Sequence, residues 1–250
     1  MKIKDIISRL EELAPVSLAE EWDNVGLMLG DRECECSGVM LALDLTAEVI
    51  EQAEKEGCNL IVTHHPFIFR PIKRVDFNEA KGREIKRLIK SDINVYSMHT
   101  NLDKTDGGIN ATLGKILGAK EYESDGVGAI IKIDPTTLGE FAKFVAKALD
   151  DKSVKIVGNA DKRIETVYVV GGSGGSEYHR ARECADVLLT GDLKHHDYID
   201  AIEDGFALVE YSHFASEIIM QNILGNTLAD LGVKIIKAKQ SSPFRLLEEI

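Results

Sequence analysis

Two adjacent histidines, His64 and His65, stand at the end of a short apolar run and are followed by Pro66. Proline cannot donate to a sheet ladder, so we expect a strand to end beside them. Neutral imidazole is the commonest metal ligand in proteins. Successive side chains on a strand point to opposite faces, so the rings share one ion only if the strand ends between them. Otherwise they serve two ions of a pair, and either arrangement indicates a metal site.

Further candidate ligands follow other apolar runs. Asp103 comes shortly after the run that ends at His99, although an aspartate there is also typical of a turn. His213 and Glu217 are four residues apart and would share one face of a helix that begins near His213. A mixed set of imidazoles and carboxylates suits Zn, Fe, Mn, Ni or Co and does not choose among them. The candidate metal ligands are therefore His64, His65, Asp103, His213 and Glu217.

Three other motifs have weaker chemical meaning. The glycine-rich stretch 171–176 could hold a phosphate through backbone N–H groups, but it lacks the Gly-Lys-Ser/Thr ending of a P-loop. We interpret it as a tight turn. His195 and His196 begin a predicted helix, and we interpret them as a pocket rim or a helix start. Trp22, the only tryptophan, is interpreted as a core anchor rather than as a stacking platform.

The elements that must position these residues alternate between strands and helices. Apolar runs predict strands over residues 39–45, 59–63, 94–98, 167–170, 187–190, 207–210 and 233–238. Helical spacing predicts helices over residues 3–14, 47–56, 79–90, 109–117, 138–149, 177–184, 195–203 and 215–231, the last being the longest. This alternation is typical of an α/β fold with mainly parallel sheets. Ligands bind beyond the carboxyl ends of strands in such sheets, which is where the candidates lie.

An internal repeat predicts two similar α/β halves. Each copy has an apolar run, a helix, a second run with a Tyr-Ser step close to a histidine, and another helix. The first copy holds runs 60–65 and 94–99, and the second holds runs 188–192 and 209–213. We expect one half over 1–123, joined by the C-terminal segment 233–250, and the other over 124–232. A site between facing halves would draw ligands from both.

Composition excludes several classes of function. The net charge of −12 argues against broad nucleic-acid binding, and the cations of segment 81–90 have the spacing of a solvated helix face. No apolar run of about 18 residues is present, so we expect no membrane span. The first residues lead into an amphipathic helix rather than a signal peptide. The four cysteines form no CxxC pair, and reduced thiols are typical of the cytoplasmic protein that we expect.

The motifs together resemble the dinuclear-metal family known as GTP cyclohydrolase 1 type 2, or Nif-three-like, over essentially the whole chain. The resemblance rests on Trp22 to Leu27, Thr63 to Pro66, His99 to Asp103, Thr190 to Asp192, and His213 with Glu217. It implies two α/β/α halves related by a pseudo-twofold, with a two-metal site between them. It also implies that the five candidates bind two divalent transition metal ions per subunit. It further implies a toroidal homohexamer, here in the short form without an inserted domain.

Two classes of function follow from this reading. The first is a metal-dependent hydrolase, cyclohydrolase-like or phosphoesterase-like, that acts on a nucleotide or a related small molecule. Two ions about 3.5–4 Å apart would polarise the substrate and lower the pKa of a bridging water, with Glu217 or Asp103 as bridging carboxylate. His99 would orient a ligand or shuttle a proton. The second class is non-enzymatic, a hexameric metal-binding adaptor or chaperone.

Overall fold

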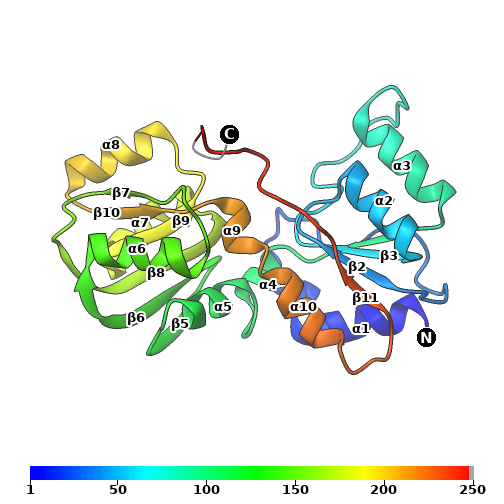
Figure 1. Cartoon of the computed structure of the whole chain (residues 1–250), viewed down its shortest axis with the longest axis horizontal. Coiled ribbons are helices and arrows are strands. Elements are labelled where there is room, and N and C mark those ends of the chain that lie inside the picture. The colour runs from blue at the N-terminus through cyan, green and yellow to red at the C-terminus, as the bar shows by residue number, and fades with distance from the viewer. Residues whose placement is uncertain (248–250) are drawn as a thin grey trace. The chain divides into compact units, whose positions relative to one another are not determined.

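The computed structural model describes residues 1–247, and the chain divides into two compact units. The first unit contains residues 1–105 and 220–241, and the second contains residues 106–219 and, of the described chain, 242–247. Figure 1 labels the elements of both. Within the described part of the chain, no helix has the length and apolar character to cross a membrane.

The first unit is built on a five-stranded sheet with the order β1-β4-β3-β2-β11. Its strands are β1 (Gly26–Leu29), β2 (Val39–Ala42), β3 (Leu60–Thr63), β4 (Asn94–Ser97) and β11 (Ile235–Lys237). Only β1 pairs antiparallel, and the other pairs are parallel. The residues of β2, β3 and β4 are all buried, which explains why these strands read as continuous apolar runs. The helices are α1 (Ile3–Leu13), α2 (Ala47–Glu56), α3 (Ala80–Lys90), α4 (Thr100–Lys104) and α10 (Met220–Leu228), with a 3₁₀ turn η1 (Val16–Leu18).

The second unit has a six-stranded sheet with the order β5-β6-β8-β9-β10-β7. Its strands are β5 (Glu121–Asp125), β6 (Gly128–Thr137), β7 (Lys155–Val157), β8 (Arg163–Ser173), β9 (Val187–Gly191) and β10 (Ala207–Glu210). Strands β8, β9 and β10 are parallel, and the outer strands pair antiparallel. The helices are α5 (Ile109–Ile116), α6 (Leu138–Ala148), α7 (Tyr178–Cys184), α8 (His195–Asp204) and α9 (His213–Glu217), with a 3₁₀ turn η2 (Gly175–Glu177). The predicted α/β class with mainly parallel strands is confirmed, with antiparallel strands added at sheet edges.

Both units repeat one order of elements around the candidate residues. The first unit runs β3, α3, β4 and α4, and the second runs β9, α8, β10 and α9. In each copy the two strands are parallel neighbours, and a helix of five residues follows the second strand. These short helices carry Asp103 and Glu217. The sequence repeat therefore corresponds to a repeated piece of structure.

The unit bounds differ from those expected from the sequence. Residues 106–123 belong to the second unit because β5 forms a hairpin with β6. Residues 220–232 belong to the first unit because α10 packs against α1 and β2. Residues 248–250, which the expected C-terminal segment includes, lie outside the described residues.

One predicted helix, over residues 215–231, was wrong. It is broken into α9 and α10, and the break lies where the chain passes from the second unit to the first. The two pieces pack in different units, with α9 against β8 and α10 against β2. Continuous helical spacing in the sequence does not reveal that change of packing partner.

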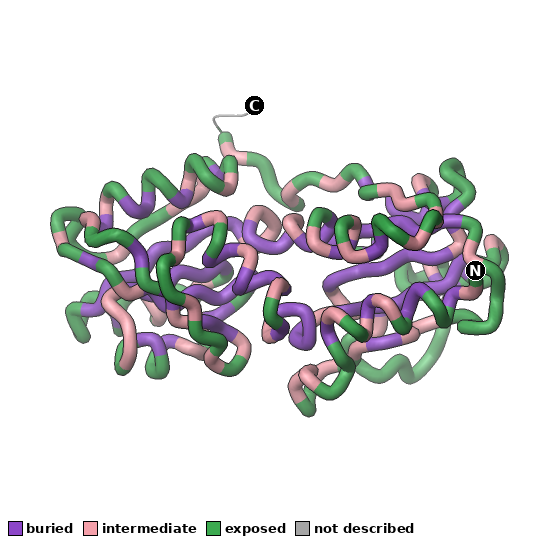
Figure 2. The backbone as a smooth tube through the Cα atoms, turned by 90° about the horizontal axis from the view of Figure 1, so that it is seen from below, coloured by how far each residue is buried: buried purple, intermediate pink, exposed green. Residues whose placement is uncertain are grey.

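Buried residues concentrate on the central strands of each sheet (Figure 2). Helix α2 shows how local sequence shapes the fold, because the Thr46 side chain accepts a hydrogen bond from the N–H of Val49 at its start. Gly57, with φ of +67°, ends the same helix in the left-handed conformation.

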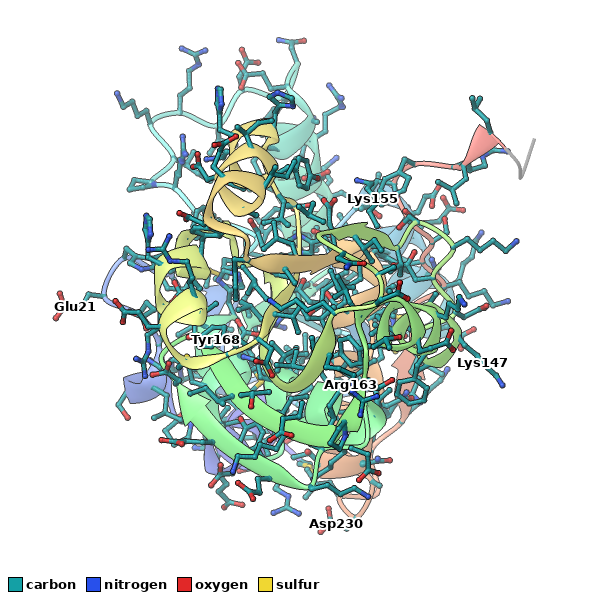
Figure 3. The ribbon with its side chains drawn as sticks, turned by 90° about the vertical axis from the view of Figure 1, so that its left-hand side faces the viewer. Glu21, Lys147, Lys155, Arg163, Tyr168 and Asp230 are labelled. Carbon is teal, nitrogen blue, oxygen red and sulfur yellow. The ribbon has the colours of Figure 1, made fainter. Side chains whose placement is uncertain are left out.

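Tyr168, labelled in Figure 3, is fully buried in the second sheet, and its hydroxyl donates to the carbonyl of Asp125. All four cysteines are free thiols, as expected.

Candidate metal centre

In the first unit, the candidate residues follow two neighbouring parallel strands. His64 and His65 come directly after β3, and their N–H groups continue the ladder by donating to the carbonyls of Ala42 and Leu43. His99 follows β4 and precedes α4, which carries Asp103. The ligand atoms of His64, His65 and His99 all lie within 4.8 Å of one another. His64 Nε2 also lies 3.5 Å from Asp103 Oδ1, so the fold brings together every candidate that this unit contains.

Hydrogen bonds at Nδ1 set the protonation of the first two histidine rings. The His64 Nδ1 lies 2.8 Å from the carbonyl oxygen of Met98. The His65 Nδ1 lies 2.7 Å from Asp44 Oδ1. Because each partner can only accept, the proton of the neutral ring sits on Nδ1 and the lone pair on Nε2. This is the arrangement that metal-binding histidines adopt in proteins.

His99 is held in the same way by a buried carboxylate. Its Nδ1 lies 2.8 Å from Asp23 Oδ1, and Thr100 donates to Asp23 Oδ2 through both its N–H and its hydroxyl. Burial raises the pKa of Asp23, but the hydrogen bonds from His99 and Thr100 outweigh it and hold this pKa at about 2. Asp23 is therefore a carboxylate at neutral pH. It fixes a ring whose centroid lies 5.2 Å from that of His64.

In the second unit, His213 and Glu217 occupy the first and last positions of α9. The Ser212 hydroxyl accepts from the Ala215 N–H and starts this helix. His213 Nε2 lies 2.8 Å from Glu217 Oε2, so the expected shared helix face is confirmed. His213 Nδ1 lies 2.6 Å from Asp192 Oδ2, directly after β9. The second unit thus repeats the carboxylate–histidine pairing of the first.

Gly172 shows why a glycine is needed beside these residues. It lies at the end of β8 with φ of +64°. A Cβ atom there would lie 2.1 Å from Glu217 Oε1 and 3.0 Å from His213 Nε2. The neighbouring glycine N–H groups donate to protein side chains, Gly171 to Asn110 and Gly172 to Ser216. The stretch lets a strand pass close to α9, and the interpretation as a simple tight turn misses that β8 continues to Ser173.

Sequence reasoning assigned no role to two of the carboxylates. Asp44 and Asp192 follow β2 and β9 and each accepts from a candidate histidine. The signal that could have found them is an aspartate just beyond a buried strand, at the sheet edge where the histidines lie. Within residues 1–247, His195 and His196 belong to no group of three potential ligands within reach, so their interpretation as a helix start fits.

The fold and the site define an α/β protein with histidine–carboxylate clusters at the carboxyl ends of parallel strands. The family model of Duf34/NIF3 (NGG1p interacting factor 3) matches residues 1–243. The chain belongs to this family, and the resemblance found in the sequence is confirmed.

Known relatives cover most of the chain. It is 39% identical over 228 residues to a GTP cyclohydrolase 1 type 2 homolog of Clostridium perfringens, with 87% of each chain covered. It is 35% identical over 249 residues to the protein of the same name from Clostridium acetobutylicum, with 93% of each covered. Among solved structures, the Staphylococcus aureus protein SA1388 matches with a TM-score of 0.91 and 31% identity, and 99% of both chains is covered.

Proposed function

We propose that this protein is a dinuclear-metal-dependent hydrolase that acts on a nucleotide-like small molecule. The proposed ligands are His64, His65, Asp103, His213 and Glu217. One observation carries the proposal. In each of these histidines, Nδ1 is hydrogen-bonded to a carboxylate or carbonyl oxygen of the same unit. This bond places the proton on Nδ1 and the lone pair on Nε2. A histidine that merely filled the core would need no such uniform arrangement.

The donor set fits a divalent transition metal. In each unit an Nε2 faces a carboxylate oxygen, at 3.5 Å between His64 and Asp103 and at 2.8 Å between His213 and Glu217. A lone pair facing a carboxylate is unfavourable unless a proton or a cation lies between them. Imidazole with carboxylate suits Zn, Fe, Mn, Ni or Co. The number of ions, two per chain, is part of the proposal.

The reaction would divide between the bound ions and nearby side chains. When bound, two divalent ions polarise the reacting bond of the substrate and lower the pKa of a bound water toward neutrality. Asp44 and the Met98 carbonyl keep the rings of His65 and His64 oriented. His99 would accept or donate a proton at Nε2, because Asp23 stabilises the positive charge that the ring gains when it accepts one.

The substrate class rests on the relatives. Two of them carry the name GTP cyclohydrolase 1 type 2 homolog, which supports a nucleotide as substrate. Nucleic acid is disfavoured by the net charge of −12, and Arg87 of the basic α3 face already pairs with Glu54. The homohexamer stays a prediction, and light scattering should give six times the 27.6 kDa chain mass.

Metal content tests the proposal directly. Protein purified without chelator should contain up to two transition metal ions per chain, and Asp103→Ala and Glu217→Ala should each lower that number. Asp134→Ala is the matched control, because this carboxylate is exposed and pairs only with Lys120 among the described residues. Near-zero metal that stays low after Zn, Fe or Mn is added would refute the site.

Turnover separates the enzyme from the adaptor. Metal-reconstituted protein should hydrolyse at least one member of a nucleotide panel, and His64→Ala should abolish this hydrolysis. The opposite result is metal binding without any turnover, together with a protein partner that wild type captures and His64→Ala does not. That result would replace the hydrolase with a metal-dependent adaptor or chaperone.

A further inference from the structure

Trp22 and Phe69 are neighbouring aromatic side chains on the surface of the first unit. The expectation that Trp22 is a core anchor was wrong, because 60% of it is exposed. Phe69 is 43% exposed, and the two ring centroids lie 6.1 Å apart at an interplanar angle of 79°. Glu21, the residue before Trp22, points outward into solvent (Figure 3). Keeping this much apolar surface in water is unfavourable, so the pair needs an explanation.

The pair is continuous with the histidine cluster. The Trp22 and Phe69 centroids lie 6.3 Å and 6.0 Å from that of His99, and both rings meet it edge-on. His99 in turn lies 5.2 Å from His64 and 5.8 Å from His65, again between ring centroids. All five rings belong to the first unit. The exposed aromatic surface therefore begins where the histidine cluster ends.

Hydrogen bonds hold the pair in place. Trp22 and Phe69 lie on separate loops, and the Asn24 side chain joins these loops by donating to the carbonyl of Ile68. Asp23, which follows Trp22, accepts from His99 and Thr100 and ties the first loop to the start of α4. The loops that carry the two rings are thus tied to each other and to α4, so ligand binding need not order these loops.

We propose that Trp22 and Phe69 form a platform for the planar aromatic ring of a small molecule whose reacting group lies at the histidine cluster. This platform rests on the proposed function. It would bind the part of the substrate that the metal does not hold. Aromatic side chains stack on any base because every base has a π face. Arg70, directly after Phe69, is exposed, so a cation is at hand for an anionic ligand.

The ring of a ligand fits this surface better than a second copy of the chain does. A specific protein interface buries about 800 Å² per partner, whereas two aromatic side chains bury roughly 150–250 Å² each at most. Trp22 and Phe69 are also the exposed aromatic residues of the described chain that contact a candidate-site histidine. A surface for a second copy would not need that contact.

The single tryptophan makes the test specific. All tryptophan emission of this protein comes from Trp22, so emission reports on the platform alone. Zinc-loaded wild-type protein is titrated with GTP, with ATP and with ribose 5-phosphate, which has no aromatic ring. GTP and ATP should quench the emission, and ribose 5-phosphate should not. Equal responses to all three, or a change that follows protein concentration instead of nucleotide, would overturn the platform.

Variants give a readout that a merely structural role would not change. Trp22→Ala should weaken GTP binding, measured by calorimetry, by roughly 5- to 140-fold, the usual range for losing one base-stacking ring. Trp22→Phe should recover most of the affinity. Phe69→Leu keeps the apolar bulk but removes the aromatic ring, and it should still lose part of the affinity for GTP. Thermal melting checks that each variant folds, as expected for residues this exposed.

The outcome is separable from that of the proposed function. Weaker GTP binding by Trp22→Ala than by wild type, without any hydrolysis by either, would keep the platform and refute the hydrolase. Hydrolysis with the same KM in wild type and Trp22→Ala would keep the hydrolase and overturn the platform. If both proposals are right, Trp22→Ala should raise KM far more than it lowers kcat. The platform would hold the aromatic ring of the substrate equally before and during the reaction.

Discussion

Replacing Asp192 with asparagine removes a charge behind His213 and little else. The Asp192 Oδ2 lies 2.6 Å from His213 Nδ1, and the other nitrogen of the same ring lies 2.8 Å from Glu217. Asparagine keeps the size of the side chain and an oxygen that accepts the hydrogen bond from Nδ1–H. Asp192 has φ of +53°, which asparagine tolerates as well as aspartate does. The variant therefore tests the carboxylate without new backbone strain.

The expected magnitude follows from the hydrogen bond. Bonds to an ionised acceptor are about twice as strong as neutral ones, so Asp192→Asn weakens the bond without abolishing it. Loss of an outer partner of a metal-binding histidine usually lowers metal affinity about 10- to 100-fold. For Asp192→Asn we expect a loss of metal affinity at the lower end of this range. Asp192→Ala should lose more, because it removes the bond and places alanine at positive φ.

Zinc affinity, measured in competition with a chromophoric chelator, is the assay. Asp192→Asn should raise the zinc Kd about tenfold, or about 1.4 kcal/mol, while the far-ultraviolet circular dichroism stays that of wild type. Asp134→Asn, an exposed carboxylate paired with Lys120, is the control and should bind zinc as wild type does. An unchanged Kd in Asp192→Asn, or an equal loss in the control, would refute the role assigned to this carboxylate.

Two further predictions concern the same structure. Gly172→Ala should destabilise the protein by about 1–2 kcal/mol through its positive φ. It should also reduce bound zinc, because the new Cβ would meet Glu217 Oε1 at 2.1 Å; unchanged melting and metal content would contradict this. The pKa of Asp23 falls from its ordinary 3.8 to about 2 on folding, so its contribution to stability is present above pH 4 and is lost as the pH falls toward 2. Urea unfolding should therefore show Asp23→Asn less stable than wild type at pH 7, with the difference shrinking between pH 4 and pH 2; a constant difference would contradict it.

Much of the first unit's cluster could be predicted because parallel strands deliver their carboxyl ends to one edge. The apolar run before His64 and the run before His99 are neighbouring strands, paired from Leu60 to Thr63. The polar residues after them must then lie close together. The same logic holds for β9 and β10, where Asp192 and His213 come together. Periodicity and strand ends suffice for that inference.

What the sequence did not reveal depends on tertiary packing. A helix of five residues such as α4 is too short to show a helical period, so Asp103 seemed to lie in a loop. The carbonyl of Met98 has no signature in the residue type that carries it. Trp22 seemed a core residue because its size favours burial, and only the fold shows that its loop lies at the surface. These misses lie around the proposed site, where local rules give way to function.

The prediction that ligands from both units serve one centre can be tested by hydrogen exchange without any activity. Zinc at 100 times its Kd would stabilise the folded protein by about 2.7 kcal/mol. Amides that exchange only when the zinc-binding structure opens should then exchange roughly 100-fold more slowly. In a shared centre this protection should reach β3 and β4 of the first unit. It should fall to about twofold in Glu217→Ala if that variant weakens zinc 100-fold.

His64→Ala is the matched variant in the first unit, and it should remove the protection of β3 and β4 whether or not the centre is shared. The two variants together decide the question. If Glu217→Ala leaves zinc protection of the first unit intact while His64→Ala removes it, the first unit binds its metal alone. The shared two-metal centre would then be wrong, even though each histidine keeps its carboxylate or carbonyl partner. If both variants remove the protection, metal binding at His64 depends on Glu217 as well.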